Sequence, residues 1–251
     1  MTGIFLVEGM SLNISKLTLT IDEKGNISGN MDMGVGYDAC IAWAEIALRQ
    51  REEALRRMHE RQSIWKRPEE PGNEHGRVLA AEFGSSVQSI VSAAICIDAL
   101  YDHLIRYTPI DQDIRRPWIK NRTARYIQIS EAIRLSFDTK KNESESIRNN
   151  LKAIFKLRDA AVHPSGKSIP PHRHPDIDIA TDWQFSAFRG DVADNSVCFA
   201  VRLIWDITRG TKYKSESLGQ FISGLKKRIE KLLPNGPPIS ANASVGTFIP
   251  D

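Results

Sequence analysis

Hydrophobic and polar residues alternate near the N-terminus, whereas from about residue 37 onward the hydrophobic residues recur at helical spacing. The run 12–22 is rich in β-branched residues, and the turn sequence DEKGN leads into a second short run that begins at Ile27. Alternation with a period of two around a glycine-containing turn is typical of a β-hairpin. We therefore predict a small N-terminal β-hairpin appendage over residues 1–35.

The helical pattern predicts an all-α bundle of about six helices over residues 36–233. Its clearest apolar stripe lies in the helix predicted at about 74–106, and comprises Leu79, Phe83, Val87, Ile90, Ala94, Ile97, Tyr101 and Leu104. Steps of three and four residues are the signature of an amphipathic helix. The other predicted helices span about 38–64, 117–137, 142–163, 191–209 and 215–233. Around 93–97 the apolar residues extend beyond one face, which predicts that the second helix is central.

The helix boundaries follow from local signals. Asn142 is a candidate N-cap with Glu145 three residues on, as in a capping box, and Pro164 disfavours helix at the residue before it. The tail 234–251 is small and polar, which predicts a flexible C-terminus. Residues 36–233 show no internal repeat and no long linker, so we expect one helical domain.

Composition excludes several classes of protein. The chain has 251 residues, of which 41% are hydrophobic and 26% charged, and this argues against wholesale disorder. The longest apolar stretch, 90–100, contains Asp98 and is shorter than the roughly 20 residues of a membrane span. The first residues lack the features of a secretory signal. We therefore expect a cytoplasmic protein that does not bind membranes.

Cysteine usage and charge add two expectations. Cys40, Cys96 and Cys198 lie far apart in apolar helical contexts, which favours reduced core cysteines over a disulfide framework or a zinc site. The net charge of +3 permits a nucleic-acid partner but does not require one.

One residue, Arg158, breaks the apolar pattern of the helix predicted at 142–163. At about 100° per residue it falls in the middle of the apolar stripe of that helix. The stripe comprises Ile147, Leu151, Ile154, Phe155, Ala161 and Val162. A guanidinium stays charged, so its burial without partners is very costly. Either a carboxylate meets Arg158 inside the protein, or this stretch faces a cleft or a partner subunit.

His163 follows five residues later, at the C-terminus of the same helix. There the helix dipole favours the imidazolium form of the side chain. On an ideal helix His163 and Arg158 point about 140° apart. They converge only if the last turn is distorted at Pro164, or if a second chain supplies part of the site.

The string LRDAAVHP, residues 157–164, resembles the R-x4-H signature of the HEPN superfamily (higher eukaryotes and prokaryotes nucleotide-binding domains). Asp159 follows the arginine, as a polar residue commonly does in that pattern. The segment 92–104 resembles the central HEPN helix that carries an acidic residue, here Asp98, and 121–133 resembles the helix that follows it. The resemblance extends over roughly residues 38–163 and implies a HEPN-like bundle.

The resemblance also implies a metal-independent endoribonuclease that works as a homodimer, with the two motifs at the interface and no cofactor. Histidine suits acid or base catalysis near neutral pH, which gives His163 that role. Arg158 would stabilise charge on the phosphate, and Asp159 or Asp98 would orient the arginine or the histidine.

The family setting suggests a toxin or defence effector, with an antitoxin or another protein as a further partner. The alternative is a non-catalytic HEPN-like module that binds RNA or protein. In that case Arg158 pairs with Asp98 in the core and His163 simply ends the helix.

Basic residues are candidates for RNA binding in two places. Arg115, Arg116, Lys120 and Arg122 cluster between two helices, and Lys167 follows the R-x4-H motif. The same residues also fit an ordinary solvated face with ion pairs between neighbouring turns, and this reading is favoured. The loop that contains His172 and His174 has nearby carboxylates, and together these side chains would supply metal ligands. A solvated polar loop is nevertheless the preferred interpretation. No metal site is predicted.

Overall fold

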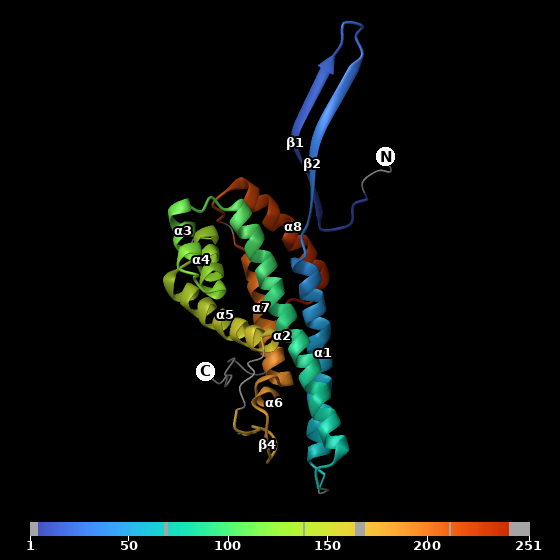
Figure 1. The fold of residues 1–251 in the computed structure, drawn as a ribbon, viewed down its shortest axis with the longest axis vertical. Helices are drawn as coiled ribbons and strands as arrows, with labels where there is room; N and C mark the ends of the chain where they lie inside the picture. Colours follow the sequence, from blue (N-terminus) through green and yellow to red (C-terminus); the bar gives the residue numbers. More distant parts are fainter. Residues whose placement is uncertain (1–4, 68–69, 138, 164–168, 211, 241–251) are drawn as a thin grey trace. The chain divides into compact units, whose positions relative to one another are not determined.

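A computed structural model describes residues 5–67, 70–137, 139–163, 169–210 and 212–240. The chain divides into two units, a hairpin unit that ends at Ala39 and a helical unit that begins at Cys40 (Figure 1). The prediction of a predominantly helical protein with a small N-terminal sheet is confirmed.

The hairpin unit consists of two long antiparallel strands, β1 (Met10–Ile21) and β2 (Ile27–Tyr37). Their turn is built as its sequence suggests. The Asp22 carboxylate accepts hydrogen bonds from the backbone N–H groups of Lys24 and Asn26 and from the Asn26 side-chain amide. The bonds from Asn26, first the side-chain bond and then the backbone bond, lower the pKa of Asp22. Gly25 has a φ of +80°, a conformation that glycine adopts without strain.

The helical unit contains eight helices in the described part of the chain, where the sequence predicts about six. They are α1 (Cys40–Trp65), α2 (Asn73–Tyr107), α3 (Gln112–Lys120), α4 (Arg125–Phe137), α5 (Lys141–Val162), α6 (Trp183–Ala187), α7 (Gly190–Ile207) and α8 (Glu216–Leu232). Helix α2 contacts α1, α4, α5, α6, α7 and α8, which confirms that it is central (Figure 1).

The helix predicted from Pro117 onward is in fact two helices. Helix α3 begins before that proline, because the Asp111 carboxylate caps it by accepting a hydrogen bond from the backbone N–H of Asp113. It ends at Lys120, and Arg122 then adopts a φ of +48°, which no helix accommodates. Helix α4 therefore begins anew at Arg125.

Helix α5 begins slightly earlier than its capping signal predicts. Its N-cap is Lys140, so Asn142 lies inside the first turn and is not the cap. The helix continues to Val162 and has His163 as its C-cap, as expected from Pro164. The apolar stripe is buried at Leu151, Ile154 and Phe155 but not at Val162, which is exposed.

The loop after α5 is more ordered than its composition suggests. Within residues 169–189 it forms a two-residue pairing of β3 (His172–Arg173) with β4 (Ala180–Thr181), and then the short helix α6. Trp183 and Phe188 from this segment are buried with Leu157 of α5 and Ile90 of α2 in a second hydrophobic cluster. Apolar burial of this kind holds the segment against the bundle.

The larger hydrophobic cluster fills the space between α1, α2, α4, α5, α7 and α8. Cys40, Cys96 and Cys198 are buried, as predicted for core cysteines, and burial raises the pKa of the Cys198 thiol to about 11. By length and composition α2 could also cross a membrane, but just over half of its apolar window is buried inside the protein.

The predicted C-terminal tail is described only in its first part. The Ser240 hydroxyl donates a hydrogen bond to the Asp194 carboxylate of α7, 2.6 Å away. Residues 241–251 lie outside the described residues.

Candidate functional site

Arg158 is met by carboxylates, the first of the two alternatives that the sequence offers. Its Nη1 donates to Asp98 Oδ2 on α2 at 3.3 Å, and its Nε and Nη2 donate to Asp159 Oδ1 at 2.9 and 2.7 Å. The guanidinium also lies over the Phe155 ring, 4.7 Å from its centroid. The side chain is 23% exposed, so it lies at the edge of the core with one side open to solvent.

A second arginine, Arg125 of α4, shares Asp98 with Arg158. Arg125 Nε donates to Asp98 Oδ1 at 2.6 Å, and its Nη2 is 3.6 Å from Asp102 Oδ1. Asp98 therefore links α4 to α5 through α2. We call Asp98, Arg125, Arg158 and Asp159 the arginine–aspartate cluster.

Tyr101 contacts this cluster through Arg125. The Arg125 guanidinium lies over its ring, 4.3 Å from the centroid, and its hydroxyl donates to Gln128 Oε1 at 3.0 Å. Burial raises the pKa of Tyr101, while the charges of Arg125 and Arg115 lower it in part. The charge of Arg115 on α3 therefore acts on Tyr101.

Sequence reasoning places Asp98 and Arg158 together only through the family resemblance, and it does not assign Arg125 or Tyr101 to the site. The sequence nevertheless contains a spacing signal that places Tyr101 and Arg125 near Asp98. Asp98, Tyr101 and Asp102 are spaced by three and four residues, which puts them on one face of α2. Arg125 is the first residue of α4, where it can pair with that acidic face of α2.

His163 lies apart from the cluster. It is exposed, and its backbone N–H donates to the Asp159 carbonyl at 2.9 Å. Helix α5 is regular through Val162, and His163, its C-cap, leaves the helix with a φ of −127° and a ψ of 67°. On an ideal helix, positions 158 and 163 are about 140° apart. Among the described residues no hydrogen bond joins their side chains. Pro164 and Lys167 lie outside the described residues.

The basic candidates on α3 are only partly brought to the site. Arg115 is half-buried and its charge acts on Tyr101, whereas Arg116, Lys120 and Arg122 are exposed. Arg116 Nη1 lies 4.0 Å from Asp113 Oδ1, one turn away on the same helix. This pair matches the solvated-face interpretation, and Arg115 is the one α3 candidate with a described link to the cluster.

A second charged network lies where α1, α2 and the 169–189 segment meet. Arg61 of α1 has a fully buried side chain whose Nε donates to Glu82 of α2, and its Nη2 donates to Asp176 Oδ2 at 2.7 Å. Glu82 Oε1 also accepts the backbone N–H of Gly190 at 2.9 Å, at the start of α7. Arg189 approaches Asp176 from the other side, with Nε 3.8 Å from Oδ2.

The prediction of a solvated loop at His172 and His174 is wrong for His174. This side chain is 1% exposed, and its Nδ1 accepts the backbone N–H of Asp176 at 3.2 Å. Burial, aided by the charge of Arg61, lowers the pKa of His174 to about 4, so the ring is neutral at pH 7. The loop is held down because Asp176 pairs with the buried Arg61. Among the described residues, no three His, Cys, Asp or Glu side chains are grouped to hold a metal ion.

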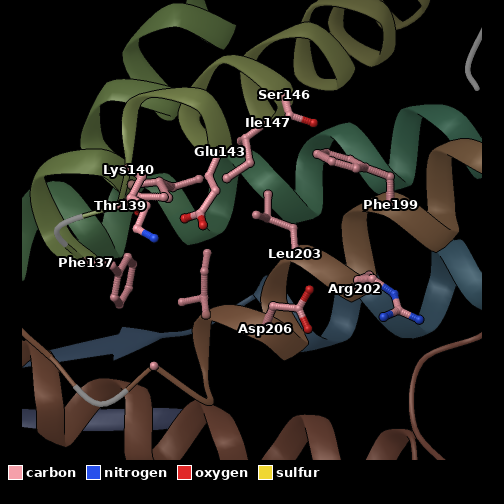
Figure 2. Close-up of a pocket in the computed structure, with 13 residues that line it drawn as sticks. Phe137, Thr139, Lys140, Glu143, Ser146, Ile147, Phe199, Arg202, Leu203 and Asp206 are labelled. Carbon is pink, nitrogen blue, oxygen red and sulfur yellow. The ribbon is translucent and has the colours of Figure 1, made fainter.

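A cavity of about 650 Å³ lies between α4, the start of α5, and α7 (Figure 2). Its floor is apolar, with Ile147 of α5 and Leu203 of α7 among the lining residues, and the charged side chains of Lys140, Glu143 and Asp206 lie around it. The volume is in the range of small-molecule sites. Among the residues that the structure describes, none of the predicted site residues lines this cavity, so it is separate from the arginine–aspartate cluster.

Comparisons with known proteins add no family to this picture. No protein-family model matches the chain, and neither the curated proteins nor the solved structures give a significant match.

Proposed function

We propose that the chain is a metal-independent endoribonuclease of HEPN type, which acts in the cytoplasm as a homodimer with a composite site. The observation that carries the proposal is the set of contacts and the exposure of Arg158. It is held by two carboxylates at a partly open edge of the core, one turn before a helix end whose cap is an exposed histidine.

The chemistry is attack of a ribose 2′-hydroxyl on the adjacent phosphate. His163 removes a proton from the hydroxyl or delivers one to the leaving oxygen. Arg158 donates hydrogen bonds to the phosphate as negative charge develops on it. Asp98 and Asp159 are positioning residues, because both hold the guanidinium through the contacts described above.

The divergence of Arg158 and His163 supports the homodimer. Positions 158 and 163 are about 140° apart on an ideal helix, and the Arg158 guanidinium donates to Asp98 and Asp159. A second copy that presents its own α5 end would bring the His163 of one copy to the Arg158 of the other.

The biological setting is proposed on the resemblance alone. An endoribonuclease of this type is a toxin or defence effector, so an antitoxin or another protein that blocks the site is its expected partner. Its substrate is RNA, and the protein has no membrane role.

A second candidate function is a non-catalytic RNA-binding or protein-interaction module, and the charge balance of the cluster favours protein interaction within it. Arg158 and Arg125 are opposed by Asp98, Asp102 and Asp159, so the local positive charge is already neutralised. A guanidinium engaged in this way resembles a structural ion pair.

Single variants separate the two functions. We expect Arg158→Ala and His163→Ala each to lower RNA cleavage by about 100-fold or more, the usual range for a lost acid–base or charge-stabilising group. Arg148→Ala and His59→Ala are matched controls, since both residues are exposed and lie outside the cluster. Far-UV circular dichroism checks that each variant is folded.

Mixing the two inactive variants tests the composite site. In a mixed dimer one site receives both intact residues, so the mixture should recover about a quarter of wild-type activity if exchange is complete and random. Retained cleavage in Arg158→Ala or His163→Ala would contradict the proposed site. Cleavage lost in both variants with no recovery on mixing would contradict the shared interface.

A further inference from the structure

One face of the β1–β2 hairpin is formed by apolar side chains from both strands. The strand register and the alternation of side chains define its members. They are Met10, Leu12, Ile14, Leu17, Leu19 and Ile21 from β1, and Ile27, Met31, Met33, Val35 and Tyr37 from β2. We call this set the apolar hairpin face.

An extra residue in β1 keeps this face continuous. Ile14 pairs with Met33 and Lys16 pairs with Asp32, so Ser15 is a bulged residue without its own partner. Side chains alternate with a period of two, so an unbulged strand would turn every later side chain to the other face. The bulge therefore puts Leu17 on the same face as Ile14, and the rest of the strand follows.

The opposite face is polar. Its described side chains are Ser11, Lys16, Thr18, Thr20, Ser28, Asn30 and Asp32. The hairpin is thus amphipathic, yet ten of the large side chains of its apolar face are between 40% and 71% exposed. A contiguous apolar surface of this size marks an interaction site, and a lone two-stranded hairpin is only marginally stable in water.

Charge argues against lipid or nucleic acid as the partner. The described hairpin residues, 5–37, carry four acidic side chains and two lysines, a net charge of −2. Anionic lipid surfaces and phosphate backbones attract basic segments. A single hairpin also has two open edges, whose backbone groups would lack hydrogen bonds inside a bilayer.

The apolar hairpin face is instead self-complementary. It contains no charged side chain, so two copies meet without an unpaired buried charge. Burying these side chains against an equal face removes roughly 500 Å² from each copy, about 1,000 Å² in total, which is the lower limit for a specific interface.

We propose that the apolar hairpin face packs on the same face of a second copy of this chain. The two hairpins form a two-layer sandwich with sheets about 10 Å apart, as in β-sandwich cores. A two-fold axis relates them, so the same residues are buried on both copies. The inference is independent of the proposed nuclease function, because it concerns the hairpin unit alone.

Sedimentation equilibrium of the full chain, from about 1 to 100 µM, tests the proposal. The expected result is a reversible dimer with a Kd in the micromolar range, as suits an interface of this size. The double variant Leu17→Thr with Leu19→Thr keeps β-forming residues but removes apolar surface, and should raise the Kd at least tenfold. The matched control, Thr18→Ser with Thr20→Ser on the polar face, should leave it unchanged.

Deletion of Ser15 is a second variant, and it changes no apolar residue. It joins Ile14 directly to Lys16, so the alternation of side chains keeps Leu17, Leu19 and Ile21 on the apolar face, and the Kd should stay close to that of the wild type. Circular dichroism and a urea transition confirm that the helical unit of each variant remains folded.

Three results would overturn the inference. One is a monomer at every concentration. Another is a self-associated wild type whose Kd is unchanged by the double variant Leu17→Thr with Leu19→Thr, which would place the interface elsewhere and leave a nuclease dimer possible. The third is dye release by the wild type from phosphatidylcholine–phosphatidylglycerol vesicles, which would assign the face to lipid. Loss of RNA cleavage in Arg158→Ala or His163→Ala has no bearing on these three results.

Discussion

At the scale of single residues, the buried Arg61 shows how the fold compensates for the desolvation of an internal charge. Its guanidinium has two carboxylate partners from different parts of the chain, Glu82 and Asp176, and the Glu82 carboxylate also accepts the backbone N–H of Gly190. Removing one partner of a buried pair costs more than the pair contributes, because a charge is left uncompensated.

We expect Glu82→Gln to lower the free energy of unfolding by about 3 kcal/mol, since it removes the charge opposite the buried Arg61. Glu53→Gln is the matched control. Glu53 lies on the surface of α1, where hydrogen bonds from Arg56 and Arg57 lower its pKa to about 2. Surface pairs of this kind contribute about 1 kcal/mol or less. Urea unfolding of both variants at pH 7 measures the difference, and equal losses would contradict a buried network.

His174 makes stability depend on pH. Its pKa is about 4 in the folded protein and about 6.5 in an unfolded chain. Between these values the unfolded chain binds the proton and the folded protein does not, so stability is lost as the pH falls from about 6.5 toward 4. We expect His174 to account for about 2 to 3 kcal/mol of the loss between pH 7 and pH 4.5.

His174→Asn isolates this contribution, because the Asn side-chain oxygen can replace Nδ1 as acceptor for the Asp176 N–H and does not titrate. Urea midpoints at pH 7 and pH 4.5 should fall less in the variant than in the wild type. Equal falls would mean that other groups cause the acid sensitivity.

At the scale of elements, periodicity was sufficient for the long helices. The observed ends of α2, α7 and α8 lie within one or two residues of those predicted, because apolar residues recur at helical spacing along each of these helices. The division between α3 and α4 was missed, since it depends on the backbone conformation of Arg122. The burial of His174 was missed as well, because its partner Arg61 lies in a distant helix and local composition suggests only a polar loop.

The close contact between α1 and α7 gives a prediction for this scale. At Gly190 an added Cβ would lie 2.7 Å from Met58 Cβ and 2.8 Å from the Ala54 carbonyl oxygen. Gly190→Ala must therefore separate the two helices, and we expect it to lower the free energy of unfolding by about 1 to 3 kcal/mol.

Gly224→Ala is the control for that variant. Gly224 is an exposed residue inside α8 whose added Cβ meets nothing within 4 Å. We expect this change to raise stability by up to about 1 kcal/mol, because alanine favours helix over glycine. Thermal unfolding of the two variants should show shifts of opposite sign, and shifts of the same sign would contradict this packing.

At the scale of the whole molecule, the candidate site combines what the sequence predicts with what only the fold supplies. The position of Arg158 in an apolar stripe predicts either a carboxylate partner or a cleft or partner subunit at this place, and the family resemblance names Asp98. Arg125 and Tyr101 complete the cluster because α2 brings its acidic face against α4 and α5. The angle of about 140° between positions 158 and 163 on an ideal helix is the reason that we propose a second copy of the chain.

The most direct test of the central claim is incubation of the purified wild-type chain with mixed RNA in the presence of EDTA, followed by analysis of the product ends. For the proposed nuclease we expect cleavage that leaves 2′,3′-cyclic phosphate ends, because the 2′-hydroxyl is the nucleophile and no metal is required. Intact RNA after incubation with folded protein would contradict the nuclease and favour the non-catalytic module.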